Sequence, residues 1–291
     1  MSNVLIIGAS GLVGSYLYRL ISNEYDTTGT FRGHPLKNAI YLDITDRQAV
    51  REIILRTSPD YVFLPAALTN VDRCEEEKEL CFGVNVGGTQ NIVDALKGTA
   101  AKLVYFSTDY IFDGRNGPYS ESDQPHPLSE YGKSKLEGET NIQRNLDNFL
   151  IIRTTCVYGW EPQEKNFAIN LIKKIRAGDK IEVPIDQITT PTYAGSLAEI
   201  TWGLAKKDKR GIYNVAGNSL LSRLEFAYLV SAIFGLDRSL IQGVKTQVMQ
   251  HRALRPLNGG LKIDKIKEEL GLGIPGSREG LLLMQKERAY E

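Results

Sequence analysis

Residues 4–14 read Val4-Leu5-Ile6-Ile7-Gly8-Ala9-Ser10-Gly11-Leu12-Val13-Gly14 and decide the fold. The four apolar residues predict a buried strand, and the amphipathic run at 12–22 predicts a helix directly after it. Glycines in such a turn let the backbone approach a pyrophosphate at the helix N-terminus. Their spacing is GxxGxxG rather than GxGxxG, but it meets the same physical requirement. The stretch therefore predicts the first strand, phosphate-binding turn and helix of a dinucleotide-binding domain.

Short apolar segments alternate with longer amphipathic ones through the first half of the chain. This pattern predicts further strands at 26–31, 39–42, 61–64, 103–106 and 149–152, and helices at 45–57, 75–96 and 128–144. Continuous apolar strands separated by helices indicate a parallel sheet covered on both faces. Right-handed crossovers make such a sheet doubly wound. The predicted fold class is α/β, a doubly wound parallel sheet of the Rossmann type with a smaller C-terminal α/β domain.

The end of the second predicted strand indicates which dinucleotide binds. An NAD-binding domain usually carries an acidic residue there, about twenty residues after the glycines, to hold the ribose 2′-hydroxyl. Here residues 28–34 read TGTFRGH and contain no acid. Arg32 can instead accommodate a 2′-phosphate. The sequence therefore favours NADPH, with NADH left as an alternative. The other interpretation of Arg32 is an ordinary solvated loop arginine without a ligand.

The second half of the chain is less regular. It predicts helices near 165–177, at 194–206 and at 222–234, a strand at 211–215 and a helix that ends at Gly271. We place the boundary near residue 155. Residues 1–155 would then form the NADP-binding Rossmann domain and residues 156–291 the substrate-binding domain. The helix at 194–206 is expected to return to the first domain.

Composition limits the classes of partner. The 291 residues include 35 basic and 35 acidic side chains, so the formal net charge is zero, unlike that of most nucleic-acid or membrane-surface binders. No stretch reaches the ~18 apolar residues of a membrane span, and no targeting segment is visible. The cysteines Cys74, Cys81 and Cys156 form no CxxC pair, which predicts no metal site and a reducing compartment. We expect a cytoplasmic protein without nucleic-acid or membrane partners, and monomer or homodimer stays open.

Tyr131 and Lys135 stand four residues apart in a predicted helix, so they share one face. Ser107-Thr108-Asp109 ends the strand before it, where the carboxyl ends of parallel strands line the ligand crevice. Reducing a ketone needs a proton at oxygen, and a lysine ammonium is expected to lower the tyrosine pKa from its usual ~10. Thr108 would donate to the carbonyl oxygen. The alternative is a packing tyrosine beside a solvated lysine.

These motifs, in this order, resemble the extended short-chain dehydrogenase/reductase superfamily. The closer resemblance is to the dTDP-4-dehydrorhamnose reductase family. Segments 107–114 (STDYIFDG), 118–121 (PYSE) and 131–139 (YGKSKLEGE) carry it, and similarity extends from Pro59 to Leu261. It implies NADPH-dependent reduction of the 4-keto group of a nucleotide-linked 6-deoxy sugar, dTDP-4-dehydro-L-rhamnose, to dTDP-L-rhamnose.

The resemblance also implies residue roles. Thr108, Tyr131 and Lys135 would be catalytic, with Tyr131 as the proton donor. Thr108, Asp109 and Arg255 would contact the nucleotide-sugar. The positions implied to contact the cofactor are Gly8, Ser10, Gly11, Leu12, Gly14, Arg32, Asp43, Ile44, Ala66, Ala67, Tyr131 and Lys135.

One departure keeps other functions open. Cys156 stands where the resemblance implies a tryptophan against the sugar, and an absent ring removes apolar and stacking contact. The regulatory β subunit of methionine adenosyltransferase, which binds NADP and a partner enzyme, is also similar and also lacks that tryptophan. The alternatives are therefore such a regulatory subunit, or a reductase of a different nucleotide-ketosugar.

Overall fold

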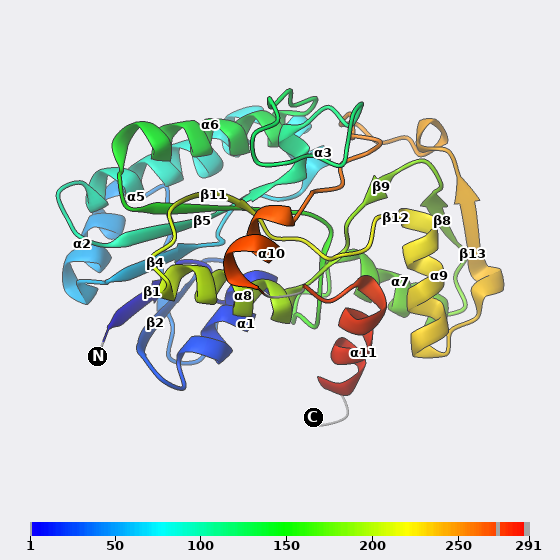
Figure 1. Cartoon of the computed structure of the whole chain (residues 1–291), viewed down its shortest axis with the longest axis horizontal. Helices are drawn as coiled ribbons and strands as arrows, with labels where there is room; N and C mark the ends of the chain where they lie inside the picture. The colour runs from blue at the N-terminus through cyan, green and yellow to red at the C-terminus, as the bar shows by residue number, and fades with distance from the viewer. Residues whose placement is uncertain (1, 272–273, 288–291) are drawn as a thin grey trace.

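A seven-stranded parallel sheet forms the centre of the molecule, with helices on both faces (Figure 1). The computed structural model describes residues 2–271 and 274–287. The strand order is β11-β6-β5-β4-β1-β2-β3, and every neighbouring pair is parallel. These strands are β1 (Asn3–Ile6), β2 (Asp26–Phe31), β3 (Ile40–Tyr41), β4 (Tyr61–Leu64), β5 (Lys102–Thr108), β6 (Phe149–Thr154) and β11 (Gly211–Asn214). The predicted doubly wound α/β fold is confirmed.

The alternation of side chains along β1 builds both halves of the core. Val4 and Ile6 pack on one face of the sheet, and Leu5 and Ile7 pack on the other. The first face is covered by α1 (Leu12–Ile21) and α8 (Ala194–Lys206), and the second by α2 (Arg47–Thr57), α5 (Thr89–Leu96) and α6 (Glu130–Asn145) (Figure 1). Both faces are therefore buried, as continuous apolar strands require. No helix among the described residues has the length and apolar character to span a membrane.

The single helix predicted over 75–96 is wrong. The chain instead forms α3 (Val71–Glu76), α4 (Lys78–Phe82), the π-helical turn η1 (Gly83–Gly88) and α5. Asn70 starts α3 early because its side chain accepts a hydrogen bond from the Arg73 N–H. Glu77, at φ −117° and ψ 62°, interrupts the helix, and η1 then places Asn85 beside the loop after β4.

The C-terminal half adds three two-stranded sheets and five α-helices to the described part of the chain. β11 pairs with β6 in the central sheet, and α8 packs against α1. Segments after residue 155 therefore contribute a strand to the central sheet and a helix to its covering layer. The domain boundary near residue 155 stays a prediction. The remaining elements are β7 (Val157–Tyr158), α7 (Phe167–Arg176), β8 (Ile181–Pro184), β9 (Ile188–Thr189), β10 (Thr192–Tyr193), β12 (Leu221–Ser222), α9 (Arg223–Phe234), β13 (Ile241–Val244), α10 (Asp264–Leu270) and α11 (Ser277–Glu287).

Candidate active site

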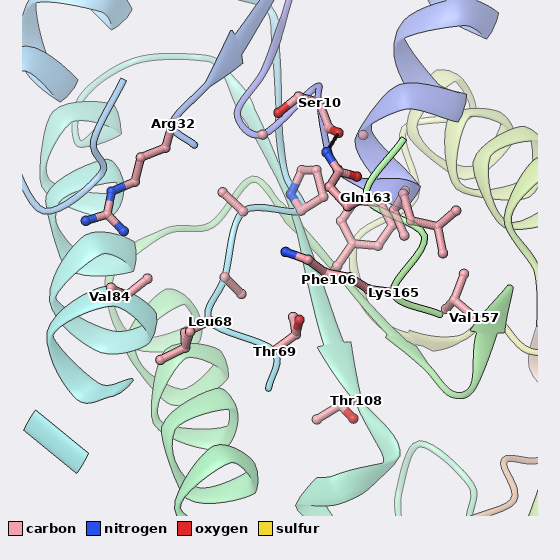
Figure 2. A pocket seen from close by; sticks show the side chains of 18 of the residues that line it. Ser10, Arg32, Leu68, Thr69, Val84, Phe106, Thr108, Val157, Gln163 and Lys165 are labelled. Atoms are coloured by element: carbon pink, nitrogen blue, oxygen red, sulfur yellow. Dashed lines mark hydrogen bonds between the residues drawn. The ribbon is translucent and has the colours of Figure 1, made fainter. Parts of the chain in front are cut away.

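A cavity of about 700 Å³ opens at the carboxyl ends of β1, β4, β5 and β6 (Figure 2). This is the edge where parallel sheets of this type bind ligands. All but one of the residues predicted for the site line it: Gly8, Ser10, Gly11, Leu12, Gly14, Arg32, Asp43, Ile44, Ala66, Ala67, Thr108, Asp109, Tyr131 and Lys135. The topology therefore brings together segments more than a hundred residues apart in sequence.

The glycine turn forms a cradle that only small residues allow. Gly8 has φ +97°, and a Cβ on Gly14 would lie 2.1 Å from the Gly8 carbonyl oxygen, so α1 starts tight against the turn. Gly11 precedes α1, and no side chain caps the helix there. The N–H groups of the first helical turn and the positive end of the helix dipole are thus available to an anion. This geometry fits the pyrophosphate of a dinucleotide.

Arg32 and Asp43 lie together at the adenine side predicted for the cavity. The Arg32 Nε donates to Asp43 Oδ2 at 2.7 Å, and Asp43 also accepts from the backbone and hydroxyl of Thr45. Partial burial raises the pKa of Asp43, but these hydrogen bonds and the guanidinium outweigh it and hold the pKa below its usual range. The pair keeps the Arg32 side chain at the cavity wall, with its terminal nitrogens available for a phosphate.

Tyr131 is placed by the start of α6 against the loop after β5. Ser129 caps the helix by accepting from the Gly132 N–H at 3.2 Å. A Cβ on Gly132 would come within 2.2 Å of the Tyr110 carbonyl oxygen, so glycine permits this approach. The side chain of Thr108 lies close enough to the Tyr131 phenol to influence its pKa. The two groups predicted to act on a carbonyl oxygen therefore line the same part of the cavity.

Burial is the largest influence on Tyr131 and raises the pKa of its phenol well above the usual value, against a smaller lowering from the Thr108 side chain. The predicted lowering by Lys135 is wrong in this structure. The Lys135 Nζ instead lies 3.9 Å from the centroid of the Tyr105 ring, a cation–π contact. A phenol with a raised pKa stays protonated at neutral pH, as a proton donor must.

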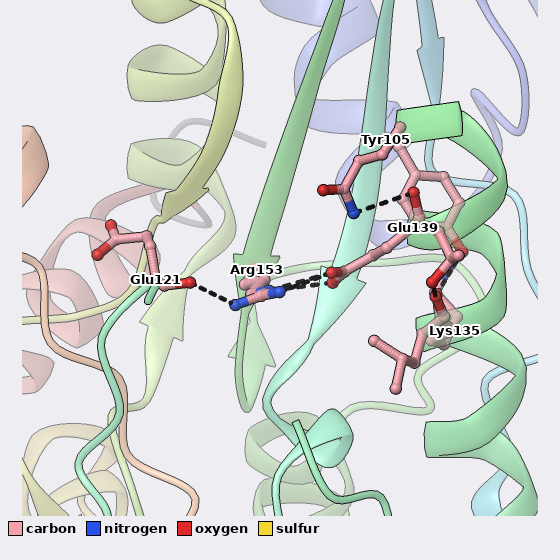
Figure 3. A network of polar contacts seen from close by, with 8 residues as sticks. Tyr105, Glu121, Lys135, Glu139 and Arg153 are labelled. Carbon is pink, nitrogen blue, oxygen red and sulfur yellow. Dashed lines mark hydrogen bonds and ion pairs between the residues drawn. The ribbon is translucent and has the colours of Figure 1, made fainter. Parts of the chain in front are cut away.

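Lys135 is a buried cation on the adjacent turn of α6. Desolvation lowers its pKa to about 7, while the Glu139 carboxylate and Cys81 act in the opposite direction. Figure 3 shows that Glu139 turns toward Arg153 on β6, which it binds at 2.7 Å. Arg153 Nη1 also donates to the Glu121 carbonyl oxygen at 3.1 Å. This network ties α6 to β6.

Three further residues at the site have no role assigned from the sequence, although Asn85 is part of the segment that resembles the family. Asn85 binds both the N–H and the carbonyl oxygen of Leu68 and so holds the cavity-lining loop after β4. Gln163 Nε2 donates to the Ser10 carbonyl oxygen at 2.7 Å, and Lys165 lines the cavity beside it (Figure 2). None of them belongs to a motif with recognisable spacing, so no local signal pointed to them.

Arg255 is the one predicted site residue that does not line the cavity. Its Nη2 donates to Asp72 Oδ2 at 2.8 Å and contacts His251 Nδ1 at 3.2 Å. It also interacts electrostatically with Tyr110, which does line the cavity. The guanidinium therefore stands one side chain behind the wall, and its role toward a nucleotide-sugar stays a prediction.

Comparisons with known proteins agree with this geometry. The family model described as "RmlD substrate binding domain" matches residues 1–289. The chain is 33% identical to dTDP-4-dehydrorhamnose reductase of Aggregatibacter actinomycetemcomitans over 289 residues, 94% of each chain. It is 30% identical to methionine adenosyltransferase 2 subunit beta of Danio rerio over 279 residues, covering 93% of this chain and 85% of that one.

Among solved structures, dTDP-4-dehydrorhamnose reductase from Bacillus anthracis str. Ames, crystallised in complex with NADP, superposes with a TM-score of 0.91. Its sequence identity to this chain is 30%, and the match covers 99% of this chain and 100% of that one. Sequence and structure thus agree over nearly the full length, and the chain belongs to the dTDP-4-dehydrorhamnose reductase family.

Proposed function

We propose that this protein reduces the 4-keto group of a nucleotide-linked 6-deoxy sugar with NADPH, and that dTDP-4-dehydro-L-rhamnose is the substrate. One observation carries the proposal: Thr108, Tyr131 and Lys135 line the same cavity as the glycine cradle. Relatives that carry the reductase name over nearly their full length support it. The product would be dTDP-L-rhamnose.

Different residues of the chain would perform the separate steps of ketone reduction. Bound NADPH supplies the hydride. Tyr131 gives its proton to the sugar oxygen, and Thr108 donates a hydrogen bond to the same oxygen as negative charge develops there. Lys135 lines the same cavity, where the nicotinamide ribose would enter, and holds a positive charge there below about pH 7. The glycine cradle orients the cofactor so that these groups meet one face of the ketone.

The direct test is to mix the purified protein with NADPH and dTDP-4-dehydro-L-rhamnose and to follow nicotinamide absorbance. Oxidation at a rate proportional to protein concentration is the expected result. The likeness to methionine adenosyltransferase 2 subunit beta supports a second candidate, an NADP-binding regulatory subunit. The absence of NADPH oxidation, together with co-purification of a methionine adenosyltransferase, would favour that candidate.

Arg32→Ala should weaken NADPH binding about 10- to 100-fold and leave NADH binding nearly unchanged. A charge-assisted hydrogen bond to the 2′-phosphate is worth roughly 1.5–3 kcal/mol, and NADH has no such group. Fluorescence titration with both nucleotides measures the two dissociation constants. Arg47→Ala serves as the control, because Arg47 is an exposed arginine on α2 outside the cavity lining. Equal losses for both nucleotides would remove the 2′-phosphate role.

The pH profile of reduction should reflect Lys135. Its pKa of about 7 means that the side chain is charged at lower pH and neutral at higher pH. We therefore expect kcat/KM for NADPH, which reports the free enzyme, to be level in acid and to fall above about pH 7. Assays between about pH 5 and pH 9 measure it, with Lys135→Met as the control that loses the descending limb. A wild-type profile that stays level to about pH 9 would contradict this assignment.

Assembly and compartment are separate proposals. We propose a cytoplasmic protein, and size-exclusion chromatography with light scattering decides between a monomer and a homodimer. Light scattering measures molar mass directly, so the two states differ twofold in the readout.

A further inference from the structure

Arg223 is held against Cys156, a residue of the cavity wall. It is the first residue of α9, whose N-cap is Ser222, and its N–H donates to the Gln187 carbonyl oxygen at 2.8 Å. Its guanidinium carbon lies 4.7 Å from the centroid of the Phe167 ring. Its Nη1 reaches Cys156 Sγ at 2.7 Å, and Cys156 lines the cavity. The planar head is therefore fixed directly behind Cys156, and Arg223 itself is not one of the residues that line the cavity.

The charge on Arg223 lacks a close counter-ion. Among the described residues, no carboxylate oxygen lies within 4.0 Å of its guanidinium. Burial raises the pKa of the Cys156 thiol, so this contact is a neutral sulfur, which is a weak acceptor. By contrast, Arg153 binds Glu139 at 2.7 Å and Arg255 binds Asp72 at 2.8 Å. Arg223 keeps several N–H donors for a partner from outside the chain, because a desolvated guanidinium without acceptors is costly.

Asp109 defines the chemistry of that partner. It lines the cavity, accepts from Thr108 Oγ1 at 3.2 Å and interacts electrostatically with Arg223. Burial raises its pKa to about 6, with the Thr155 and Thr108 hydrogen bonds and Arg223 acting against that rise. It is therefore ionised at neutral pH and would repel a phosphate or a carboxylate. A hydroxyl group suits both residues, since it accepts from a guanidinium and donates to a carboxylate.

We infer that Arg223 is a specificity-determining residue that donates hydrogen bonds to a hydroxyl of the substrate's sugar, which in turn donates to Asp109. The inference rests on the proposed function and deepens it, because it assigns recognition of the hexose to a guanidinium and a carboxylate. Arg223 would therefore contact the sugar and not the diphosphate, because Asp109 would repel the diphosphate. Sugars that lack the bridging hydroxyl should bind poorly.

Calorimetric titration of the NADP-bound protein with dTDP-L-rhamnose and with dTDP alone tests this inference. Arg223→Leu should weaken binding of dTDP-L-rhamnose about 10- to 100-fold and change binding of dTDP less than about threefold. Arg223→Lys and Arg223→Gln keep donors and should lose less. Arg238→Ala is the matched control, since the Arg238 guanidinium lies at 3.6 Å over Tyr228, which unlike Cys156 does not line the cavity. Thermal melting checks that each variant is folded, and Arg223→Met, which also lacks donors, replaces the leucine variant if that one is not.

Equal weakening of dTDP and dTDP-L-rhamnose would overturn the inference, because Arg223 would then bind the diphosphate. Unchanged binding of both, or no binding of dTDP-L-rhamnose by the wild-type protein, would overturn it as well. The proposed reductase activity is judged by a different readout, the oxidation of NADPH. A protein that binds dTDP-L-rhamnose through Arg223 but oxidises no NADPH with the ketosugar would retain the inference and lose the activity.

Discussion

Tyr131→Phe should lower kcat for ketone reduction by about 10²- to 10⁴-fold while the dissociation constant for NADPH stays within about twofold. The phenol lines the cavity together with Thr108, and burial keeps it protonated and ready to donate. Phenylalanine preserves the ring, including its edge-on packing against Tyr110 at 5.7 Å between centroids. The substitution thus removes the hydroxyl that donates the proton and leaves the packing of the ring unchanged.

Stopped-flow or steady-state assays with saturating NADPH and ketosugar give kcat, and fluorescence titration gives the NADPH affinity. Tyr213→Phe is the control, because it removes another buried tyrosine hydroxyl, one bonded to Glu269 away from the cavity. It should retain wild-type kcat. Wild-type turnover by Tyr131→Phe would show that another group delivers the proton, and the mechanism above would be wrong.

The fold can be predicted from the sequence because the local sequence patterns agree with the tertiary structure. The apolar run of β1, the glycine turn and α1 each have a distinct pattern, and parallel strands between helices leave few topologies. The segment after β4 was misread as one helix because its breaks depend on particular residues. Glu77 leaves helical geometry, and Gly88 lies where a Cβ would be 2.6 Å from the Ile44 side chain. Such contacts have no periodic signature in the sequence.

The sequence predicts only those residues of the candidate site that belong to spaced motifs. Gly8, Tyr131 and Lys135 belong to spacings with a physical meaning, and all three line the cavity. Arg223 meets Cys156 across 67 residues of sequence, so nothing local marks it. The direction of the Tyr131 pKa was also beyond the sequence, because desolvation depends on how completely the folded chain covers the phenol.

Arg153→Met should reduce the free energy of unfolding by about 3–5 kcal/mol, because it leaves Glu139 charged without its partner in the interior. The Glu139 side chain is 0% exposed and that of Arg153 is 4% exposed, and three hydrogen bonds of 2.7, 3.1 and 3.3 Å join them. Figure 3 shows the pair spanning α6 and β6. Urea unfolding followed by circular dichroism measures the loss. Lys102→Met would be an unsuitable comparison, since Lys102 pairs with the exposed Asp208.

The matched comparison is the double variant Glu139→Met, Arg153→Met, which removes both charges and should recover much of the lost stability. It should not recover the wild-type pH profile. The Glu139 carboxylate raises the pKa of Lys135, so its removal lowers that pKa, and the fall in kcat/KM should begin at a lower pH than in the wild-type protein. If the double variant were as unstable as Arg153→Met, loss of packing rather than an uncompensated charge would explain the single variant. An unshifted pH profile would mean that Glu139 stabilises α6 without influencing Lys135.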